Sequence, residues 1–264
     1  MSFEKTYITD THAHYDDDAF NDDREELLLS LREAGIGKVI NVGASMDGCY
    51  DSYDLCKKYP FIFCALGVHP SECGELTGED MEWIRQKTSD EKVVAIGEIG
   101  LDYHFDDDPA PEIQQKWFKE QLILAGQTGL PVIIHSRDAA ADTLRVLSEN
   151  HAEDIGGVMH CYSYSKEMAS QFLEMGLYFG IGGVITFKNG RKLREVVEYI
   201  PVEKILLETD CPYLAPEPYR GKRNCSLYLP GVAEAVAAIK GMTTEELISV
   251  TTQNAHRLFG LGEI

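Results

Sequence analysis

Residues 93–98 of the chain read VVAIGE and residues 131–135 read PVIIH, two short apolar runs that each end in a side chain able to bind a metal ion. Similar side chains stand at the ends of other apolar runs, namely His12, His14, His160 and Asp210. Continuous runs rich in Val and Ile are typical of strands buried on both faces of a parallel sheet. In a (β/α)8 barrel the C-terminal ends of all strands lie at one face, where the chemistry takes place. The pattern therefore predicts this fold.

Eight apolar runs bounded by turn residues are predicted to be strands, near residues 6–11, 37–42, 61–67, 93–98, 131–135, 156–160, 178–182 and 204–210. Between them, residues 23–34, 111–128 and 190–199 have the 3.6-residue periodicity of amphipathic helices. Pro111 is placed to open its helix, and Thr243 with Glu246 is a predicted capping box. Repeated alternation without a linker predicts one α/β domain over residues 1–264, a (β/α)8 TIM barrel, with a doubly wound open sheet as the alternative.

The length and composition fit this prediction. The chain has 264 residues, close to the roughly 250 of a single (β/α)8 domain. The first residues do not resemble a signal peptide, and no apolar stretch is long enough to span a membrane, so we expect a cytoplasmic protein.

The seven cysteines are scattered without a CxxC pair, which predicts free thiols in a reducing compartment. Cys161 and Cys211 are predicted to pack inside the barrel.

The net charge of −20 restricts the class of partner. A protein that grips long duplex DNA along its surface is expected to be basic. A nucleic-acid substrate of this chain would therefore be held locally, by metal ions and a few cations in a pocket. We expect no membrane and no obligate protein partner. The acidic runs 16–18 and 106–108 lack the spacing of a calcium loop and are predicted to be solvated.

The metal-binding side chains form a defined pattern. His12 and His14 are two residues apart, so on a strand both rings point to the same side. The other candidates end the predicted fourth, fifth, sixth and eighth strands, as Glu98, His135, His160 and Asp210. Imidazole and carboxylate ligands suit Zn, Mn, Fe or Mg, and six of them predict a site for two divalent ions. His151 and His256 fall outside the pattern and are predicted to be structural or exposed.

The chain resembles the TatD-type metal-dependent deoxyribonucleases, within the wider amidohydrolase-like barrel superfamily, from residue 6 to about residue 259. The matching motifs are DTHAH at 10–14, GVHP at 67–70, AIGEIGLDYH at 95–104, PVIIHSRDA at 131–139, MHCYS at 159–163, LLETDCPYL at 206–214 and RGKRN at 220–224. The resemblance implies that one ion is held by His12, His14, Glu98 and Asp210. It implies that the other is held by Glu98, His135 and His160, so Glu98 would bridge.

This resemblance implies a 3′–5′ exonuclease or phosphodiesterase that acts on the ends of single-stranded DNA, with RNA as a further substrate. A hydroxide held between two ions, Zn, Mg or Mn, would attack the phosphorus, because such ions lower the pKa of bound water. Asp210 and Glu98 would be the catalytic residues, with Asp210 accepting the proton. Asp210 as a ligand alone is the alternative.

Several polar side chains in the predicted loops are candidates to bind the substrate: His69, His104, Arg137, Arg223 and Asn224, with Arg220 and Lys222 beside the last two. The alternative role of the cationic residues is salt bridging to loop carboxylates, and that of His69 is to stabilise its loop. Tyr103 and Tyr162 are predicted to pack rather than to stack on bases. The chain departs from the family at Tyr164, where a glycine is common, and at Cys225-Ser226, where an acidic residue and proline are common. We expect these positions to flank the substrate cleft.

Three other functions use the same barrel. A hydrolase of small amides, lactones or phosphotriesters would use the same pair of ions, because a fold does not define a substrate. An editing hydrolase acting on a nucleic-acid ester such as a mis-charged tRNA is another. A non-catalytic barrel with structural ions is the third. Replacing Arg223 is expected to damage a phosphodiesterase and to spare a hydrolase of neutral amides.

Overall fold

The computed structural model describes residues 7–262, in which strands and helices alternate. The strands are β1 (Ile8–Ala13), β2 (Ile36–Val42), β3 (Ile62–Leu66), β4 (Val93–Asp102), β5 (Val132–Arg137), β6 (Gly157–Met159), β7 (Tyr178–Ile181) and β8 (Ile205–Leu207). They belong to one sheet in the order β1 to β8. The pairs β3–β4, β4–β5, β5–β6 and β7–β8 are parallel. This topology confirms the predicted (β/α)8 class.

Ten α-helices are described between and after these strands. They are α1 (Arg24–Leu31), α2 (Met46–Lys58), α3 (Gly78–Lys87), α4 (Pro111–Thr128), α5 (Ala140–Glu149), α6 (Ala152–Ile155), α7 (Lys166–Glu174), α8 (Arg191–Tyr199), α9 (Leu229–Lys240) and α10 (Thr244–Phe259). The structure confirms Pro111 at the start of α4. The helix predicted over 23–34 ends earlier, at Leu31.

The described residues fall into two compact units by their backbone contacts. The first unit contains the described parts of residues 1–40 and 179–264 together with residues 161–169. The second contains residues 41–160 and 170–178. A single domain over residues 1–264 stays a prediction.

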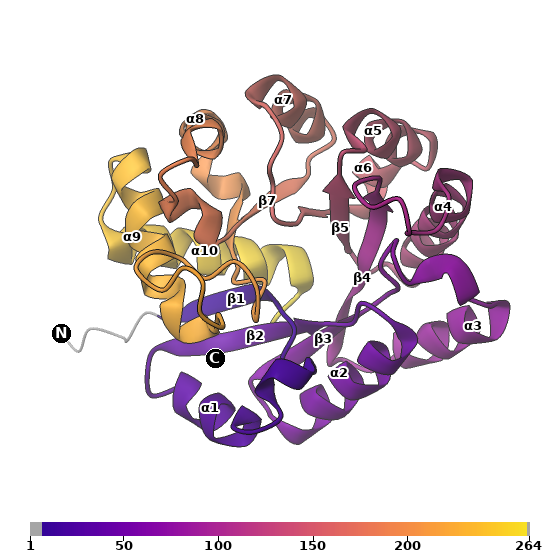
Figure 1. Cartoon of the computed structure of the whole chain (residues 1–264), viewed down its shortest axis with the longest axis horizontal. Helices are drawn as coiled ribbons and strands as arrows, with labels where there is room; N and C mark the ends of the chain where they lie inside the picture. The colour runs from indigo at the N-terminus through magenta and orange to yellow at the C-terminus, as the bar shows by residue number, and fades with distance from the viewer. Residues whose placement is uncertain (1–6, 263–264) are drawn as a thin grey trace. The chain divides into compact units, whose positions relative to one another are not determined.

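In the first unit, α9 and α10 pack against β1 and β8 (Figure 1). The predicted capping box of α10 is confirmed, since the Glu246 amide donates to Thr243 Oγ1 at 3.2 Å and the Thr243 amide to Glu246 Oε2 at 2.9 Å. The buried Asn254 of α10 donates to the carbonyls of Val202 and Ile205, each at 2.9 Å. These bonds hold the start of β8, and thereby the segment that follows it.

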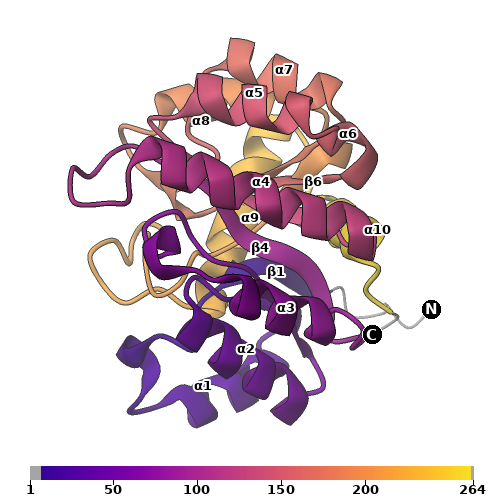
Figure 2. The ribbon, with the colours of Figure 1, turned by 90° about the vertical axis from the view of Figure 1, so that its right-hand side faces the viewer.

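In the second unit, α4 packs against β4 and lies beside α5 (Figure 2). Two buried glutamines of α4 bond the backbone where β3 and β4 end. Gln121 pairs with both the amide and the carbonyl of Val68, at 2.8 and 3.1 Å. Gln114 pairs in the same way with Asp102, at 2.8 Å for each bond. A buried backbone group needs such a partner, so α4 fixes the ends of these two strands.

Four strand boundaries predicted from the sequence were wrong. The first strand ends at Ala13 rather than at residue 11, and its predicted start at Thr6 lies outside the described residues. The fifth strand continues to Arg137, and the eighth ends three residues before Asp210. The fourth continues to Asp102, so Glu98 lies within it.

A glycine explains why the fourth strand is longer than predicted. Gly100 has φ of +147°, and a Cβ atom there would lie 1.9 Å from the carbonyl oxygen of His135. Glycine permits both this backbone conformation and the close approach of β5. Glycine inside a strand often marks a bulge or the close approach of another backbone, so Gly100 lets the strand continue past Glu98 to Asp102.

A charged cluster in the second unit gives a prediction about acid stability. Asp90 Oδ2 accepts hydrogen bonds from Lys57 Nζ at 2.7 Å and from the Tyr53 hydroxyl at 2.8 Å, and Oδ1 accepts one from the Lys92 amide at 3.0 Å. The bond from Lys57, followed by that from the Lys92 amide, lowers the pKa of Asp90 from 3.8 to about 2. The ionised carboxylate therefore stabilises the fold above pH 3.8, and this contribution is lost as the pH falls toward 2.

We expect Asp90→Asn to lower the free energy of unfolding by about 1 kcal/mol at pH 7, a value reduced for solvent screening because Lys57 is half exposed. Urea unfolding of both proteins between pH 7 and pH 3 measures the difference, which should narrow below pH 4. A difference that does not change with pH would show that the charge of Asp90 contributes nothing.

Candidate metal centre

The first unit contains a cluster of three metal-binding side chains, the β1–β8 cluster, made of His12, His14 and Asp210. The Nε2 atoms of the two histidines are 3.0 Å apart. Asp210 Oδ1 lies 3.8 Å from His12 Nε2 and 3.5 Å from His14 Nε2. The prediction that the two rings point to the same side is confirmed.

The backbone places Asp210 opposite β1, although β8 has already ended. The Asp210 amide donates to the His12 carbonyl at 2.9 Å, and the His14 amide donates to the Cys211 carbonyl at 2.9 Å. Asp210 has φ of +57°, in the left-handed region that few residues other than glycine adopt. Uncommon backbone conformations of this kind cluster at functional sites. Here the conformation holds the ligand beside the histidine pair.

A buried carboxylate supports this cluster from inside the fold, and sequence reasoning missed it. Asp10 is fully buried, and its Oδ2 accepts from Thr209 Oγ1 at 2.7 Å and from Ser226 Oγ at 2.6 Å. Burial raises the pKa of Asp10 to about 7, against the opposing hydrogen bonds from Ser226 and Thr209. The Tyr15 hydroxyl lies 2.7 Å from Ser226 Oγ. Asp10 thus ties β1 to residues on both sides of Asp210.

This network changes the role expected for Cys225 and Ser226, the two residues at which the chain differs from its family. Both side chains are buried, and Ser226 has no exposed surface. The expectation that these positions flank the substrate cleft is therefore wrong for Ser226. Its hydroxyl is an internal partner of Asp10.

The second unit contains another cluster, the β4–β6 cluster, centred on one carboxylate oxygen. Glu98 Oε1 lies 2.8 Å from His135 Nδ1, 3.8 Å from His160 Nε2 and 4.0 Å from His69 Nε2. Glu98 and His160 are buried. The rings of His69 and His135 meet edge to face, with centroids 4.3 Å apart. The structure thus brings together three predicted residues and adds His69, which had been predicted to bind substrate.

Asp102 belongs to the same cluster and was missed from the sequence. Its Oδ2 lies 3.1 Å from His135 Nε2, and its Oδ1 accepts from the His104 amide at 2.9 Å. Burial lowers the pKa of His135, but the hydrogen bonds with Asp102 and Glu98 outweigh it and raise the pKa to about 9. Asp102 lies four residues after Glu98, so both point to the same side of a strand. The correct length of the fourth strand would have revealed it.

The contact between Asp102 and His135 gives a prediction about metal affinity. A carboxylate that holds the second nitrogen of a histidine ligand fixes the ring and increases its basicity, and its loss typically costs about 10–100-fold in metal affinity or activity. We expect Asp102→Ala to weaken metal binding by about this factor, and Asp102→Asn to weaken it less because the amide oxygen still accepts a hydrogen bond. Competition with a chromophoric chelator measures the affinity.

Asp107→Ala is the matched control for this prediction, because Asp107 is exposed in the following loop. Equal affinities for Asp102→Ala and Asp107→Ala would show that Asp102 does not support a metal ligand.

The donor atoms of both clusters suit a divalent metal ion. In the β1–β8 cluster, one donor atom from each side chain lies within 4.8 Å of the others. In the second unit the donor atoms within this distance belong to His69, Asp102 and His135, so Asp102 is a possible ligand there as well as the partner of His135. Imidazole nitrogen with carboxylate oxygen is the ligand combination of many zinc, manganese and iron sites. Each cluster therefore fits one ion by the chemistry of its donors.

Two predicted substrate-binding residues of the second unit are exposed. His104 Nδ1 lies 2.8 Å from Asp138 Oδ2. The guanidinium of Arg137 lies 5.0 Å from the centroid of the Phe105 ring. Exposed contacts of this kind contribute little free energy, so both side chains can exchange their partners for a phosphate.

Arg223 and Asn224 have other partners. Both terminal nitrogens of Arg223 donate to Asp23, at 2.7 and 2.6 Å. Asn224 is fully buried, and its Nδ2 donates to the carbonyls of Thr209 and Tyr213, each at 2.8 Å. The two residues hold the loop after β8 in place, and their contact with a substrate stays a prediction.

The residues that were predicted to be structural agree with the structure. Tyr162 is buried against Phe179, with ring centroids 5.0 Å apart. His151 is exposed before α6, and His256 lies in α10 with its Nε2 3.4 Å from Lys38 Nζ.

The seven cysteines form no disulfide, and Cys211 is buried as predicted. Cys161 is only half-buried and borders a cavity.

That cavity, the β7–β8 cavity, lies in the first unit and has a volume of about 230 Å³. Asp210 of the β1–β8 cluster lines it, and so does Glu208, a buried carboxylate that sequence reasoning missed. Glu208 Oε1 accepts a hydrogen bond from the Cys161 amide at 2.7 Å. The LETD sequence at 207–210 was the available signal, since Glu208 and Asp210 are two residues apart.

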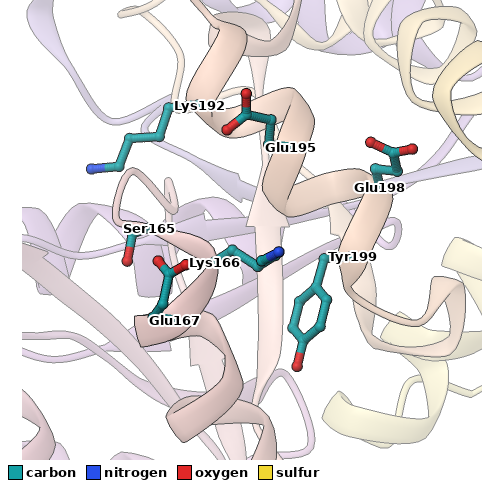
Figure 3. A pocket seen from close by; sticks show the side chains of 7 residues that line it. All are labelled: Ser165, Lys166, Glu167, Lys192, Glu195, Glu198 and Tyr199. Carbon is teal, nitrogen blue, oxygen red and sulfur yellow. The ribbon is translucent and has the colours of Figure 1, made fainter.

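Another hollow, of about 420 Å³, lies between the start of α7 and α8 (Figure 3). It is lined by two lysines, three glutamates, Ser165 and Tyr199. Lys166 extends toward Tyr199, with its Nζ 5.7 Å from the ring centroid. No histidine lines this hollow, and none of the groups of possible metal ligands found within residues 7–262 includes its residues.

Comparison with known proteins identifies the family of the chain. A family model described as TatD related DNase matches residues 9–260. The metal-dependent hydrolase YabD of Bacillus subtilis is 44% identical over 96% of this chain and 98% of its own length. The crystal structure of YjjV, a TatD homologue of Escherichia coli, superimposes with a TM-score of 0.91 at 31% identity, covering 98% of this chain and 100% of that one.

A more distant neighbour shares the fold alone. An organophosphorus hydrolase variant from Deinococcus radiodurans superimposes with a TM-score of 0.62 at 16% identity, over 97% of this chain and 94% of that one. Within residues 7–262, no helix is long and apolar enough to cross a membrane.

Proposed function

The chain belongs to the TatD-related DNase family and is a metal-dependent hydrolase, and we propose that it is a deoxyribonuclease that removes nucleotides from the 3′ end of single-stranded DNA. The proposal extends to single-stranded RNA. The convergence of His135 and His160 on one oxygen of Glu98 is the observation that carries it, because such a donor set suits a hydrolytic metal ion. The family description, TatD related DNase, supports a phosphodiester substrate.

We propose further that the two clusters serve one binuclear centre. His12, His14, Glu98 and Asp210 would hold one ion, and Glu98, His135 and His160 the other. The fold class supports this assignment, because a (β/α)8 barrel builds its site from the ends of different strands. Two divalent ions supply an activated water and neutralise charge on the phosphate.

The protein side chains would divide the remaining work. Asp210 has two carboxylate oxygens, so one can bind an ion while the other accepts the proton of the attacking water. His69 borders Glu98 and would donate a hydrogen bond to a phosphate oxygen. His104 and Arg137 are exposed cationic candidates in a chain of net charge −20. A few local donors of this kind suit a strand end better than a long duplex.

The test is degradation of a 5′-labelled single-stranded oligonucleotide with Mg, Mn or Zn, with EDTA as the control. We expect a ladder that shortens from the 3′ end, slower on a duplex and absent with EDTA. Metal content is measured on the same protein. No cleavage by protein that contains two ions per chain would refute the nuclease and leave the metal-dependent hydrolase intact.

A hydrolase of small esters, lactones or phosphotriesters is the second candidate. The compact cavity beside Asp210 favours it, as does the engagement of Arg223 with Asp23. Replacing Arg223 discriminates poorly, because the loss of this ion pair would loosen the loop whatever the substrate. Arg137→Gln discriminates better, since Arg137 has no ion pair among the described contacts: it should slow phosphodiester hydrolysis and spare a neutral lactone.

A further inference from the structure

The β7–β8 cavity shares a side chain with the β1–β8 cluster. Asp210 lines the cavity and also belongs to that cluster. A group bound at the cluster would therefore lie next to this cavity. All the lining residues belong to the first unit.

The size of the cavity limits its occupant. Its volume of about 230 Å³ is below the roughly 300–1,000 Å³ of pockets for drug-sized ligands. A single nucleoside, which is one base with its sugar, therefore fits this volume better than two linked nucleotides do. A site that admits one unit beside the reacting phosphate would favour a chain end over an internal position.

The walls of the cavity are of two kinds. Val184, Leu193 and Leu214 contribute apolar surface, which suits the faces of a planar base. Ser163, Asn189 and Lys192 also line the cavity, and all three are exposed and polar, which places them at its rim. Polar groups at the rim of an apolar pocket fix the orientation of a ligand.

Glycines form the remaining wall. A Cβ atom on Gly180 would lie 2.0 Å from Glu208 Oε2, and one on Gly183 would lie 2.1 Å from the Leu214 carbonyl oxygen. Neither position accepts another residue without a shift of its neighbours. The glycines therefore let Glu208 and the Leu214 carbonyl pack closely against the backbone of the cavity wall, which fixes its shape.

We propose that the β7–β8 cavity receives the nucleoside of the terminal nucleotide, with the phosphate attached to it at Asp210 and Lys192 at the rim. The inference rests on the proposed nuclease function and names the residues that would make it end-directed. In the reaction, the oxygen of water bonds to phosphorus and the bond from phosphorus to the 3′ oxygen of the preceding nucleotide breaks. That oxygen takes a proton, and the terminal unit leaves as a nucleoside 5′-monophosphate.

A thiol inside the cavity permits a test that does not depend on turnover. Cys161 lines the cavity and is the only cysteine among the described residues that is not buried. The rate of its alkylation by iodoacetamide is followed by mass spectrometry, with EDTA or with Mg. We expect thymidine 5′-monophosphate to slow alkylation about tenfold at saturation, and ribose 5-phosphate to slow it little, because the base provides the buried apolar area.

Two pairs of variants locate the effect. Ser163→Trp should fill the cavity, abolish protection of Cys161 and raise KM on the oligonucleotide about tenfold. Ser30→Trp is its control, because Ser30 is an exposed serine of α1 outside the cavity. Lys192→Gln should weaken protection by the monophosphate and leave protection by thymidine unchanged. Its control is Arg191→Gln, since Arg191 is exposed on the same helix and does not line the cavity.

The outcomes separate this inference from the proposed function. Exonuclease activity with no protection of Cys161 and a normal KM for Ser163→Trp would overturn the cavity assignment alone. Protection of Cys161 by nucleotides in a protein that degrades no DNA would support the cavity and refute the nuclease. Protection by a small lactone but not by thymidine 5′-monophosphate would overturn the inference in favour of a small-molecule hydrolase.

Discussion

Glu98→Ala is expected to lower metal-dependent hydrolysis by about a thousandfold, since removing a metal ligand forfeits several kcal/mol of transition-state stabilisation. Glu98 Oε1 is the one oxygen near all three histidines of the β4–β6 cluster. If Glu98 also bridges to the β1–β8 cluster, its removal lowers the content of both ions. The measurements are kcat/KM on the labelled oligonucleotide and metal stoichiometry by mass spectrometry.

Glu112→Ala is the control for this prediction, because Glu112 is an exposed residue of α4. Circular dichroism at 25 °C shows whether both variants are folded. Full activity of folded Glu98→Ala would remove Glu98 from the catalytic centre. Loss of one ion with the other retained would show that Glu98 is a ligand but not a bridge.

Asp210→Asn is expected to lower kcat by between about 100-fold and about 10,000-fold, the range that a positioned general base contributes. Asp210 Oδ1 lies within 3.8 Å of both histidines of its cluster. Asparagine keeps a neutral oxygen and the shape of the side chain but cannot accept the proton. Because Asp210 is held by its backbone, the substitution should leave the loop in place.

Metal content separates the two roles of Asp210. Two ions per chain with a low kcat would indicate a proton acceptor, and the loss of one ion would indicate a ligand. Asp22→Asn, at an exposed position, is the control. A variant with both ions and normal kcat would exclude either role.

The strand ends show how far the sequence could predict the site. The two-residue spacing of His12 and His14 was enough to place both rings together, since the periodicity of a strand is a local property. Glu98, His135 and His160 were recognised because each ends an apolar run, and the structure groups them. Asp102 was missed because the rule depends on where a strand ends, and the glycine at 100 obscured that.

The partners of charged side chains were not predictable in the same way. Arg223 was expected at a phosphate, and the structure pairs it with Asp23, 200 positions away in the chain. Asp10 bonds Ser226 across 216 positions. Which carboxylate an arginine or a serine meets depends on how distant segments pack, and no local pattern carries that information.

Hydrophobic periodicity and residue type at strand ends are local features, so the amino-acid sequence was enough to predict the fold class, the free thiols and the side chains that we expect to bind metal. The packing of distant segments was needed to show that Asp102 holds His135, that Asp10 supports the segment around Asp210 and that a compact cavity adjoins Asp210. Those features depend on burial and on distances between segments far apart in the chain. They arise only when the strands are brought side by side.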